Sequence, residues 1–136
     1  MTAQPMNALI AGASGIIGHG TARVLKQHGA RVQGLARHAI DGMDTVRADL
    51  TDAEATAHAL RAQASDTTHL FYAALAPDEN LSVEAERNGR MLGNLLDALE
   101  AADAPLERVV IYQGFKIYGI HPVFYTHLTL PTICSV

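Results

Sequence analysis

The sequence is short of the residues that build disulfide-rich, metal-binding or nucleic-acid-binding proteins. It has one cysteine, Cys134, so it cannot form an internal disulfide or a multi-cysteine metal site. Its 10 lysines and arginines are outnumbered by 14 aspartates and glutamates, and a net charge of −4 gives no basic surface for nucleic acid or an anionic membrane. We therefore expect a small-molecule ligand, and the low cysteine content favours a reducing, cytoplasmic location.

Long apolar runs and an export signal are also lacking. No stretch approaches the roughly 18 apolar residues that cross a membrane, and residues 1–5 carry no basic segment followed by an apolar one. The seven histidines are scattered, without the short paired spacing that places two imidazoles on one metal ion. We expect no membrane insertion, no export and no bound metal.

Hydrophobic residues are plentiful, at 49% of the chain, and their spacing alternates between that of strands and that of helices. Such alternation is typical of strand–helix–strand units around a parallel sheet. It predicts five strands, at residues 7–11, 31–36, 45–48, 69–74 and 108–112. Because these crossovers are right-handed, we expect an α/β, Rossmann-type, doubly wound parallel sheet of order 3-2-1-4-5, incomplete on its carboxyl-terminal side.

Three helices are predicted between these strands. The first begins near Gly15 and ends before Gly29. Its apolar residues that we expect to face the sheet are Ile16, Ile17, Val24 and Leu25. The second helix follows Thr51, which has the capping-box spacing to Glu54, and reaches about residue 64. The third runs over residues 84–101.

A glycine-rich turn connects the first strand to the first helix, with the sequence Gly12-Ala13-Ser14-Gly15-Ile16-Ile17-Gly18. The first glycine allows a sharp turn, the second lets backbone approach a pyrophosphate, and the third permits tight packing of helix on strand. Amides at the helix start then face the phosphates. The alternative is that the glycines serve only a tight connection. The position of the turn favours dinucleotide binding by Gly12, Ser14, Gly15, Ile16, Ile17 and Gly18.

The end of the second strand distinguishes NAD from NADP. An acidic residue there would bind the ribose 2′-hydroxyl of NAD, but the sequence reads Arg37-His38. An arginine can hold the 2′-phosphate of NADP through paired, charge-assisted hydrogen bonds. The alternative is that Arg37 is a solvated surface charge. We expect Arg37 and His38 to bind the cofactor, with NADP favoured over NAD.

Two further pairs of residues lie at the ends of the third and fourth predicted strands. Asp49 and Leu50 are expected to form a wall for the adenine, and the alternative for Asp49 is a turn residue ahead of Thr51. Ala74 and Leu75 come at the carboxyl edge of the sheet, where ligands bind in such folds. Small residues there let a cofactor approach, although they also suit a core.

These residues resemble those of the extended short-chain dehydrogenases/reductases, which are proteins of the NAD-dependent epimerase/dehydratase type. The resemblance rests on the glycine turn, Arg37, Asp49-Leu50, and Asn88 ahead of Leu95-Leu96-Asp97-Ala98. Residues 32–37, 69–72 and 113–119 are similar to the progesterone 5β-reductase and iridoid synthase-like group. The resemblance covers residues 7–121.

The resemblance implies reduction of the carbon–carbon double bond of enones by NADPH, and it places Lys116 on the catalytic lysine of the group. A cation near the carbonyl oxygen stabilises the enolate that forms. The alternative for Lys116 is a solvated loop lysine. Tyr112 and Lys116 match a Tyr-x-x-x-Lys pair that works on a helix, where four residues rise about 6 Å, whereas a strand extends them about 13 Å. Because Tyr112 ends a predicted strand, we do not assign it as the partner of Lys116.

The chain is predicted to divide at about residue 121. Residues 1–121 are expected to form a partial NAD(P)-binding Rossmann domain. Residues 122–136 leave the pattern of the family and resemble translated sequencing-adapter read-through, so we expect a divergent tail that is not native to it. The alternative is a genuine but divergent strand and loop, interrupted by Pro131.

The resulting hypothesis is an NADPH-dependent oxidoreductase of the enone or carbonyl reductase type, present here as its cofactor-binding amino-terminal part. This length of chain is expected to be inactive alone, because it supplies neither a catalytic tyrosine nor a substrate-covering half. The alternatives are a nucleotide-sugar epimerase or dehydratase and a non-catalytic NADP-sensing protein. The expected partners are a small-molecule substrate and, in the full-length protein, a second copy in a homodimer.

Overall fold

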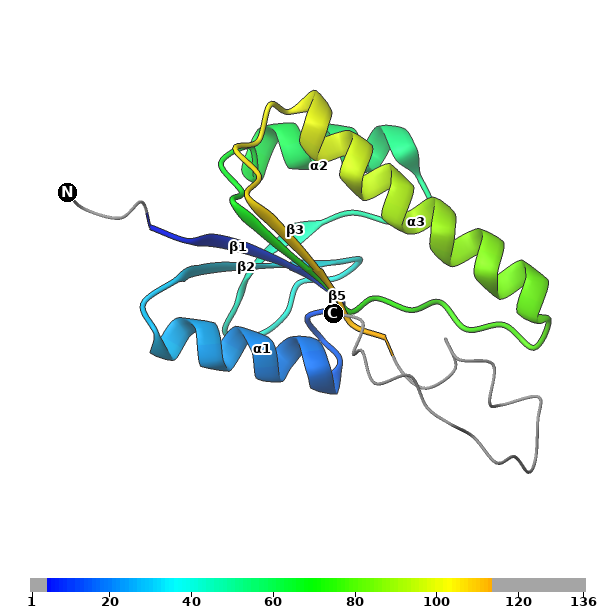
Figure 1. Cartoon of the computed structure of the whole chain (residues 1–136), viewed down its shortest axis with the longest axis horizontal. Coiled ribbons are helices and arrows are strands. Elements are labelled where there is room, and N and C mark those ends of the chain that lie inside the picture. The colour runs from blue at the N-terminus through cyan, green and yellow to red at the C-terminus, as the bar shows by residue number, and fades with distance from the viewer. Residues whose placement is uncertain (1–4, 114–136) are drawn as a thin grey trace, which may run out of the picture.

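The computed structural model describes residues 5–113, which form a parallel sheet with helices on both of its faces (Figure 1). The elements in chain order are β1 (Asn7–Ala11), α1 (Ile16–Gln27), β2 (Arg31–Ala36), β3 (Asp44–Arg47), α2 (Ala53–Gln63), β4 (His69–Tyr72), α3 (Leu81–Ala101) and β5 (Arg108–Ile111). The five strands lie in the order β3-β2-β1-β4-β5, and every neighbouring pair is parallel. The predicted doubly wound sheet is confirmed.

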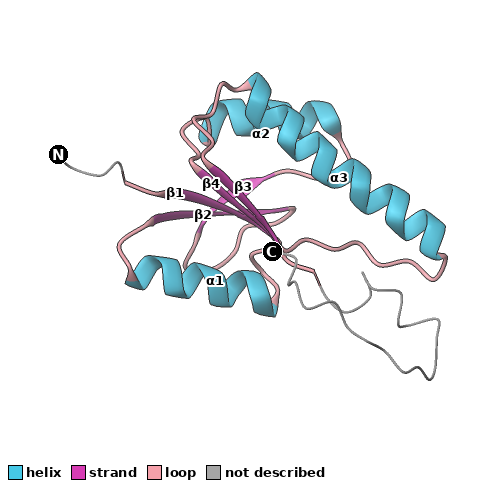
Figure 2. Ribbon diagram, in the orientation of Figure 1, coloured by secondary structure: helices cyan, strands magenta, loops and turns pink. Residues whose placement is uncertain are grey.

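The helices divide unequally between the two faces of the sheet. Helix α1 covers one face, and α2 and α3 lie together on the other (Figures 1 and 2). Each helix forms a crossover between two consecutive strands, and β2 and β3 are connected by a loop without a helix. None of the helices within residues 5–113 is long and apolar enough to cross a membrane.

Alternation along the strands divides the core into two parts. In β1, Leu9 and Ala11 point to the side of α2 and α3, while Ala8 and Ile10 point to the side of α1. The larger part, against α2 and α3, contains among its buried residues Leu9, Leu35, Val46, Leu60, Leu70, Leu95 and Leu99. The smaller part, against α1, contains Ala8, Ile10, Ala13, Ala22 and Val32. A sheet buried on both faces explains the continuous apolar runs of the sequence.

The orientation of α1 differs from the prediction. Ile16 is 94% exposed, Ile17 56% and Val24 48%, so these side chains do not face the sheet. Gly18 and Ala22 are buried, and Leu25 is the one residue of the predicted set that packs against the core. Residues 18, 22 and 25 follow the i, i+4, i+7 spacing of one helix face. The turn fixes this face because Gly18 must lie against its backbone, and the larger residues are then rotated outward.

Element boundaries also differ from the prediction, by one residue in β3 and β5 and by more at the start of α3 and the end of β4, and the cap of α2 is another residue. The side chain of Asp52, not Thr51, caps α2 by accepting a hydrogen bond from Ala55 N at 3.0 Å. Thr51 lies one residue before this cap, and its hydroxyl donates to Asp49. Helix α3 starts at Leu81, three residues before the predicted start, because Asn80 supplies a cap. Strand β4 ends at Tyr72, two residues early.

Candidate functional site

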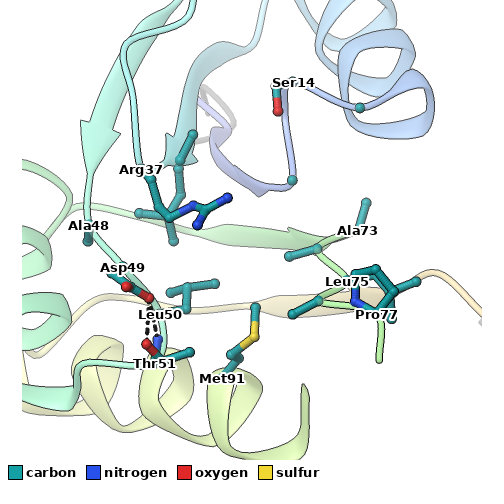
Figure 3. A pocket seen from close by; sticks show the side chains of 16 residues that line it. Ser14, Arg37, Ala48, Asp49, Leu50, Thr51, Ala73, Leu75, Pro77 and Met91 are labelled. Atoms are coloured by element: carbon teal, nitrogen blue, oxygen red, sulfur yellow. Dashed lines mark hydrogen bonds between the residues drawn. The ribbon is translucent and has the colours of Figure 1, made fainter. Parts of the chain in front are cut away.

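The carboxyl ends of the strands border a hollow of about 490 Å³ (Figure 3). Its walls come from the end of β2, from the loops that follow β1, β2, β3 and β4, and from one residue of α3. The lining residues are Gly12, Ser14, Gly15, Leu35, Ala36, Arg37, Ala48, Asp49, Leu50, Thr51, Ala73, Ala74, Leu75, Ala76, Pro77 and Met91. This edge is where ligands bind in open α/β sheets, at the point where the strand order reverses.

Two of the three motif glycines are required by the fold itself. Gly12 has a φ of +80°, and a Cβ there would lie 2.6 Å from the carbonyl carbon and oxygen of Ala73. A Cβ on Gly18 would lie 2.2 Å from the carbonyl oxygen of Gly12. Any side chain at either position would push the turn away from β4 or from α1. These glycines therefore serve the sharp turn and the tight helix packing that the motif predicts.

Gly15 has no such structural cause. Its φ of −80° and ψ of 172° suit any residue, and a Cβ would meet only the carbonyl oxygen of Gly12, at 3.5 Å. The residue is exposed and lines the hollow. A glycine at this position keeps the hollow clear beside the backbone, which is useful only if something else occupies that space.

The amino end of α1 is prepared for an anion. Its N-cap residue, Gly15, makes no side-chain hydrogen bond, and its first turn contains no acidic residue. By contrast, α2 and α3 are capped by Asp52 and Asn80 and carry Glu54 and Glu84 in their first turns. The first amides of α1 have no partner within the helix and stand at the positive end of its dipole. A phosphate group would complete this end of the helix.

Charged groups stand on the opposite wall. Figure 3 shows Arg37 extending from the end of β2 into the space between Ser14 and Asp49. The Asp49 carboxylate accepts from the hydroxyl of Thr51 at 2.7 Å and from its amide at 2.9 Å. These two bonds, together with the nearby charge of Arg37, hold the pKa of Asp49 below its ordinary value. Asp49 is thus ionised at neutral pH and fixed in place.

Two asparagines of α3 hold the other loops. The side chain of Asn88 accepts from the amide of Ala76 and donates to its carbonyl oxygen, both at 2.8 Å. Asn94 donates to the carbonyl oxygen of Leu50 at 2.8 Å. The loops after β4 and β3 are therefore anchored to one rigid helix, so the walls of the hollow keep a fixed separation.

The predicted site residues are mostly brought together. Eight of them line the hollow: Gly12, Ser14, Gly15, Arg37, Asp49, Leu50, Ala74 and Leu75. His38 lines a neighbouring hollow of about 540 Å³ that shares Arg37, Ala48 and Asp49 with the first. Ile16 and Ile17 line neither hollow, and Gly18 packs against the turn. Lys116 lies outside the described residues.

Sequence reasoning missed several residues of these walls. Thr51 acts through its two bonds to Asp49, which the pattern of an Asx turn, a side-chain oxygen bonded to the amide two residues on, could have indicated. Met91 and Pro77 also line the first hollow, and Arg47 lines the neighbouring one. No local pattern marks these three, because their positions depend on how α3 packs on the sheet, on the register of β3 against β2, and on the path of the loop after β4.

Known proteins with similar sequences are reductases and related enzymes. The sequence profile of the NAD-dependent epimerase/dehydratase family matches residues 8–131. The 3-oxo-Δ4,5-steroid 5β-reductase of Arabidopsis thaliana is 34% identical over 122 residues, which cover 82% of this chain and 31% of that protein. An (S)-8-oxocitronellyl enol synthase of Camptotheca acuminata is 32% identical with the same coverage. The chain thus spans about a third of the length of these relatives.

Solved structures share the fold. A short-chain dehydrogenase/reductase superfamily protein of Agrobacterium tumefaciens, solved with bound NAD, has a TM-score of 0.65 and 21% identity, covering 82% of this chain and 33% of its own. The UDP-glucose 4-epimerase of Thermus thermophilus in complex with NAD has a TM-score of 0.61 and 26% identity, covering 71% and 34%. With the family profile matching most of its length, the chain belongs to the NAD-dependent epimerase/dehydratase family.

Proposed function

We propose that this chain binds NADPH and forms the cofactor-binding part of an oxidoreductase that reduces enones or carbonyl compounds. The observation that carries cofactor binding is the open space at Gly15, beside an α1 amino terminus without a cap. A pyrophosphate placed there would accept from the first amides of the helix. Its two ribose–base arms would then extend along the carboxyl edge of the sheet.

NADPH is favoured over NADH by the charge at the end of β2. Arg37 lines the hollow there, the residues directly after β2 are Arg37 and His38, and Asp41, further along the same loop, lines neither hollow. Asp49, the acidic residue of the hollow, already accepts two bonds from Thr51. A guanidinium and a 2′-phosphate form charge-assisted hydrogen bonds, which are stronger than bonds between neutral groups.

Reduction is favoured over epimerisation by the sequence relatives. The curated sequence relatives at 34% and 32% identity are a steroid 5β-reductase and an enol synthase, and this supports the proposal of a reductase. Bound NADPH supplies a hydride, and the protein positions the acceptor. In the longer protein, Lys116 would stand near the carbonyl oxygen of the substrate, where its charge stabilises a developing enolate.

Calorimetric titration of the 136-residue chain with NADPH and NADH tests cofactor binding. We expect binding of both and tighter binding of NADPH; failure of both to bind would refute the proposal. The reaction is tested on a full-length protein with NADPH and a panel of enones and aldehydes. The fold shared with a UDP-glucose epimerase makes a nucleotide sugar the second substrate to assay. Tight NADPH binding without turnover of either class would indicate a cofactor sensor.

A further inference from the structure

A second arginine lies beside Arg37 at the carboxyl edge of the sheet. Arg47 is the last residue of β3, and its Cα is paired in register with Ala36, the residue before Arg37. The amide of Ala48 donates to the carbonyl oxygen of Ala36 at 3.0 Å, which extends this pairing past the end of the strand. Neighbouring strands lie about 4.8 Å apart, so the two arginines start from adjacent positions.

Both arginines face the same hollow. Val46 is buried in the core against α2 and α3, so alternation along β3 turns Arg47 to the other side. Arg47 is exposed there and lines the neighbouring hollow together with Arg37, His38, Ala48 and Asp49. The ion pairs among residues 5–113 are Arg31 with Asp66 and Arg87 with Asp78, so neither Arg37 nor Arg47 has an acidic partner in this part of the chain.

The charges of this hollow show why one arginine is insufficient. Arg37 lines both hollows together with the negatively charged Asp49, and its charge is the smallest of the influences that lower the pKa of that carboxyl, after the two hydrogen bonds from Thr51. A phosphate monoester carries about two negative charges at neutral pH and offers three acceptor oxygens. Arg37 alone would therefore be shared between a carboxylate and a phosphate. A second guanidinium restores a net positive charge at the place where a 2′-phosphate would lie.

Building on the proposed binding of NADPH, we infer that Arg47 is a specificity-determining residue that binds the 2′-phosphate of the cofactor together with Arg37. The two side chains approach the phosphate from adjacent strands, β3 and β2. Two arginines at this position distinguish NADPH from NADH by charge, because NADPH carries a phosphate where NADH carries only a hydroxyl. Arg47 thus belongs to the cofactor-binding residues, although it comes two positions before the Asp49-Leu50 pair and no sequence motif marks it.

The test compares the full chain with its Arg47→Gln, Arg47→Lys and Arg37→Gln variants by calorimetric titration with NADPH, NADH and 2′,5′-adenosine diphosphate. Arg61→Gln is the matched control, because Arg61 lies in the last turn of α2 and lines neither hollow. We expect Arg47→Gln to weaken binding of NADPH and of the diphosphate by about tenfold and to leave NADH within twofold. Arg47→Lys should retain part of the preference, and its binding should remain sensitive to salt.

The outcomes separate this inference from the proposed function. If the unchanged chain prefers NADPH and Arg47→Gln behaves like Arg61→Gln, the role of Arg47 is refuted and NADPH binding stands. If Arg47→Gln weakens NADPH and NADH equally, Arg47 supports the fold of the loop and not specificity, which also refutes the inference. If the unchanged chain binds NADPH and NADH equally, both the preference and the inference are wrong.

Discussion

The hydroxyl groups of Thr21 and Tyr112 lie 2.8 Å apart, so that α1 is joined to the residue that follows β5. Thr21 also donates to the carbonyl oxygen of Ile17, so in this contact Tyr112 is the donor and Thr21 the acceptor. The amide of Tyr112 donates to the carbonyl oxygen of Tyr72 at 3.1 Å, which continues the pairing of β5 with β4. Tyr112 therefore leaves the sheet in strand geometry, with its hydroxyl turned toward α1.

This contact predicts a small, structural effect for Tyr112→Phe. The variant loses one hydrogen bond at a site where Tyr112 is 39% exposed, so the free energy of unfolding should fall by at most about 1 kcal/mol. Affinity for NADPH should be unchanged. Urea denaturation and cofactor titration measure the two effects. A loss of NADPH affinity beyond tenfold would place Tyr112 in the cofactor site and reopen its assignment as the partner of Lys116.

Gly15→Val should separate folding from binding. The backbone at Gly15 accepts any residue, and the added Cβ meets only an ordinary contact, so helix content should be retained. The isopropyl group would fill the space beside the α1 amino terminus, and NADPH and NADH should both lose binding. Circular dichroism and calorimetry report the two properties. Gly20→Ala is the control, because nothing lies within 4 Å of its added Cβ; it should bind normally.

Gly12→Ala, unlike Gly15→Val, should lower both stability and cofactor binding. Its Cβ would lie 2.6 Å from the backbone of Ala73, and its φ of +80° is strained for alanine. We expect the free energy of unfolding to fall by about 1–3 kcal/mol or more, together with cofactor affinity. Thermal and urea denaturation measure the change. A Gly12→Ala protein as stable as the unchanged chain would show that the turn tolerates a side chain, contrary to this geometry.

The sequence predicted best those features that depend on residues close to one another along the chain. The bounds of β1 and β2 agree with the structure because each strand is a mostly apolar run that ends at the glycine turn or at Arg37. The expectation for Ile16, Ile17 and Val24 was wrong because apolar character alone does not say which helix face is inward. In α1 the contact of Gly18 with the turn decides this, and the smallest residues are buried.

Contacts between distant segments could not be predicted. Arg47 lies beside Arg37 only because of the register of β3 on β2. A shift of this register by one residue would turn the Arg47 side chain into the core. Asn88 was noted in the sequence as part of a resemblance, but its bonds to Ala76 depend on where α3 crosses the end of β4. Such positions become visible only when the sheet order and helix packing are known.

Asn88→Ala should loosen the wall of the hollow without altering the residues that we propose to bind phosphate. It leaves both backbone groups of Ala76 without their side-chain partner, which should cost about 1–3 kcal/mol of stability. Because the loop serves either cofactor, NADPH and NADH should weaken by the same factor. Arg90→Ala, at an exposed position of the same helix, is the control. A selective loss of NADPH would contradict the role of Asn88 as a positioning residue.

Thr51→Val should raise the pKa of Asp49. The bond from the Thr51 hydroxyl is the largest influence that lowers this pKa, and valine removes it, while Thr51→Ser keeps a hydroxyl. The pKa of Asp49 is lower in the folded chain than in the unfolded chain. The ionised carboxylate therefore stabilises the fold at pH values above its ordinary pKa, and this stabilisation is lost as the pH falls through the pKa of the folded chain. The valine variant should therefore lose stability at neutral pH but not in strong acid. Carboxyl carbon NMR titration measures the pKa directly; an unchanged value would contradict the assignment.

Tyr72→Phe should increase stability. The Tyr72 side chain is 6% exposed in the core against α2 and α3, and its hydroxyl has no hydrogen-bond partner among residues 5–113. A buried hydroxyl without a partner carries a desolvation cost of about 1–3 kcal/mol, and phenylalanine removes the hydroxyl while it keeps the ring. We expect the free energy of unfolding to rise by about 1 kcal/mol. Thermal and urea denaturation measure this difference, and a loss of more than about 1 kcal/mol would show that the hydroxyl has a partner.

The same residue predicts an alkaline effect. Burial raises the pKa of Tyr72 above its ordinary value, so above about pH 10 the unfolded chain releases this proton while the folded chain retains it. The unfolded state then binds fewer protons, and the free energy of unfolding falls as the pH rises. Tyr72→Phe lacks this group, so its advantage over the unchanged chain should grow between about pH 9 and pH 11. Urea denaturation of both proteins at a series of pH values gives this difference in the free energy of unfolding. The other tyrosines are present in both proteins, so their contributions cancel. A constant difference across this range would mean that Tyr72 ionises as readily in the folded chain as in the unfolded one, which contradicts its burial.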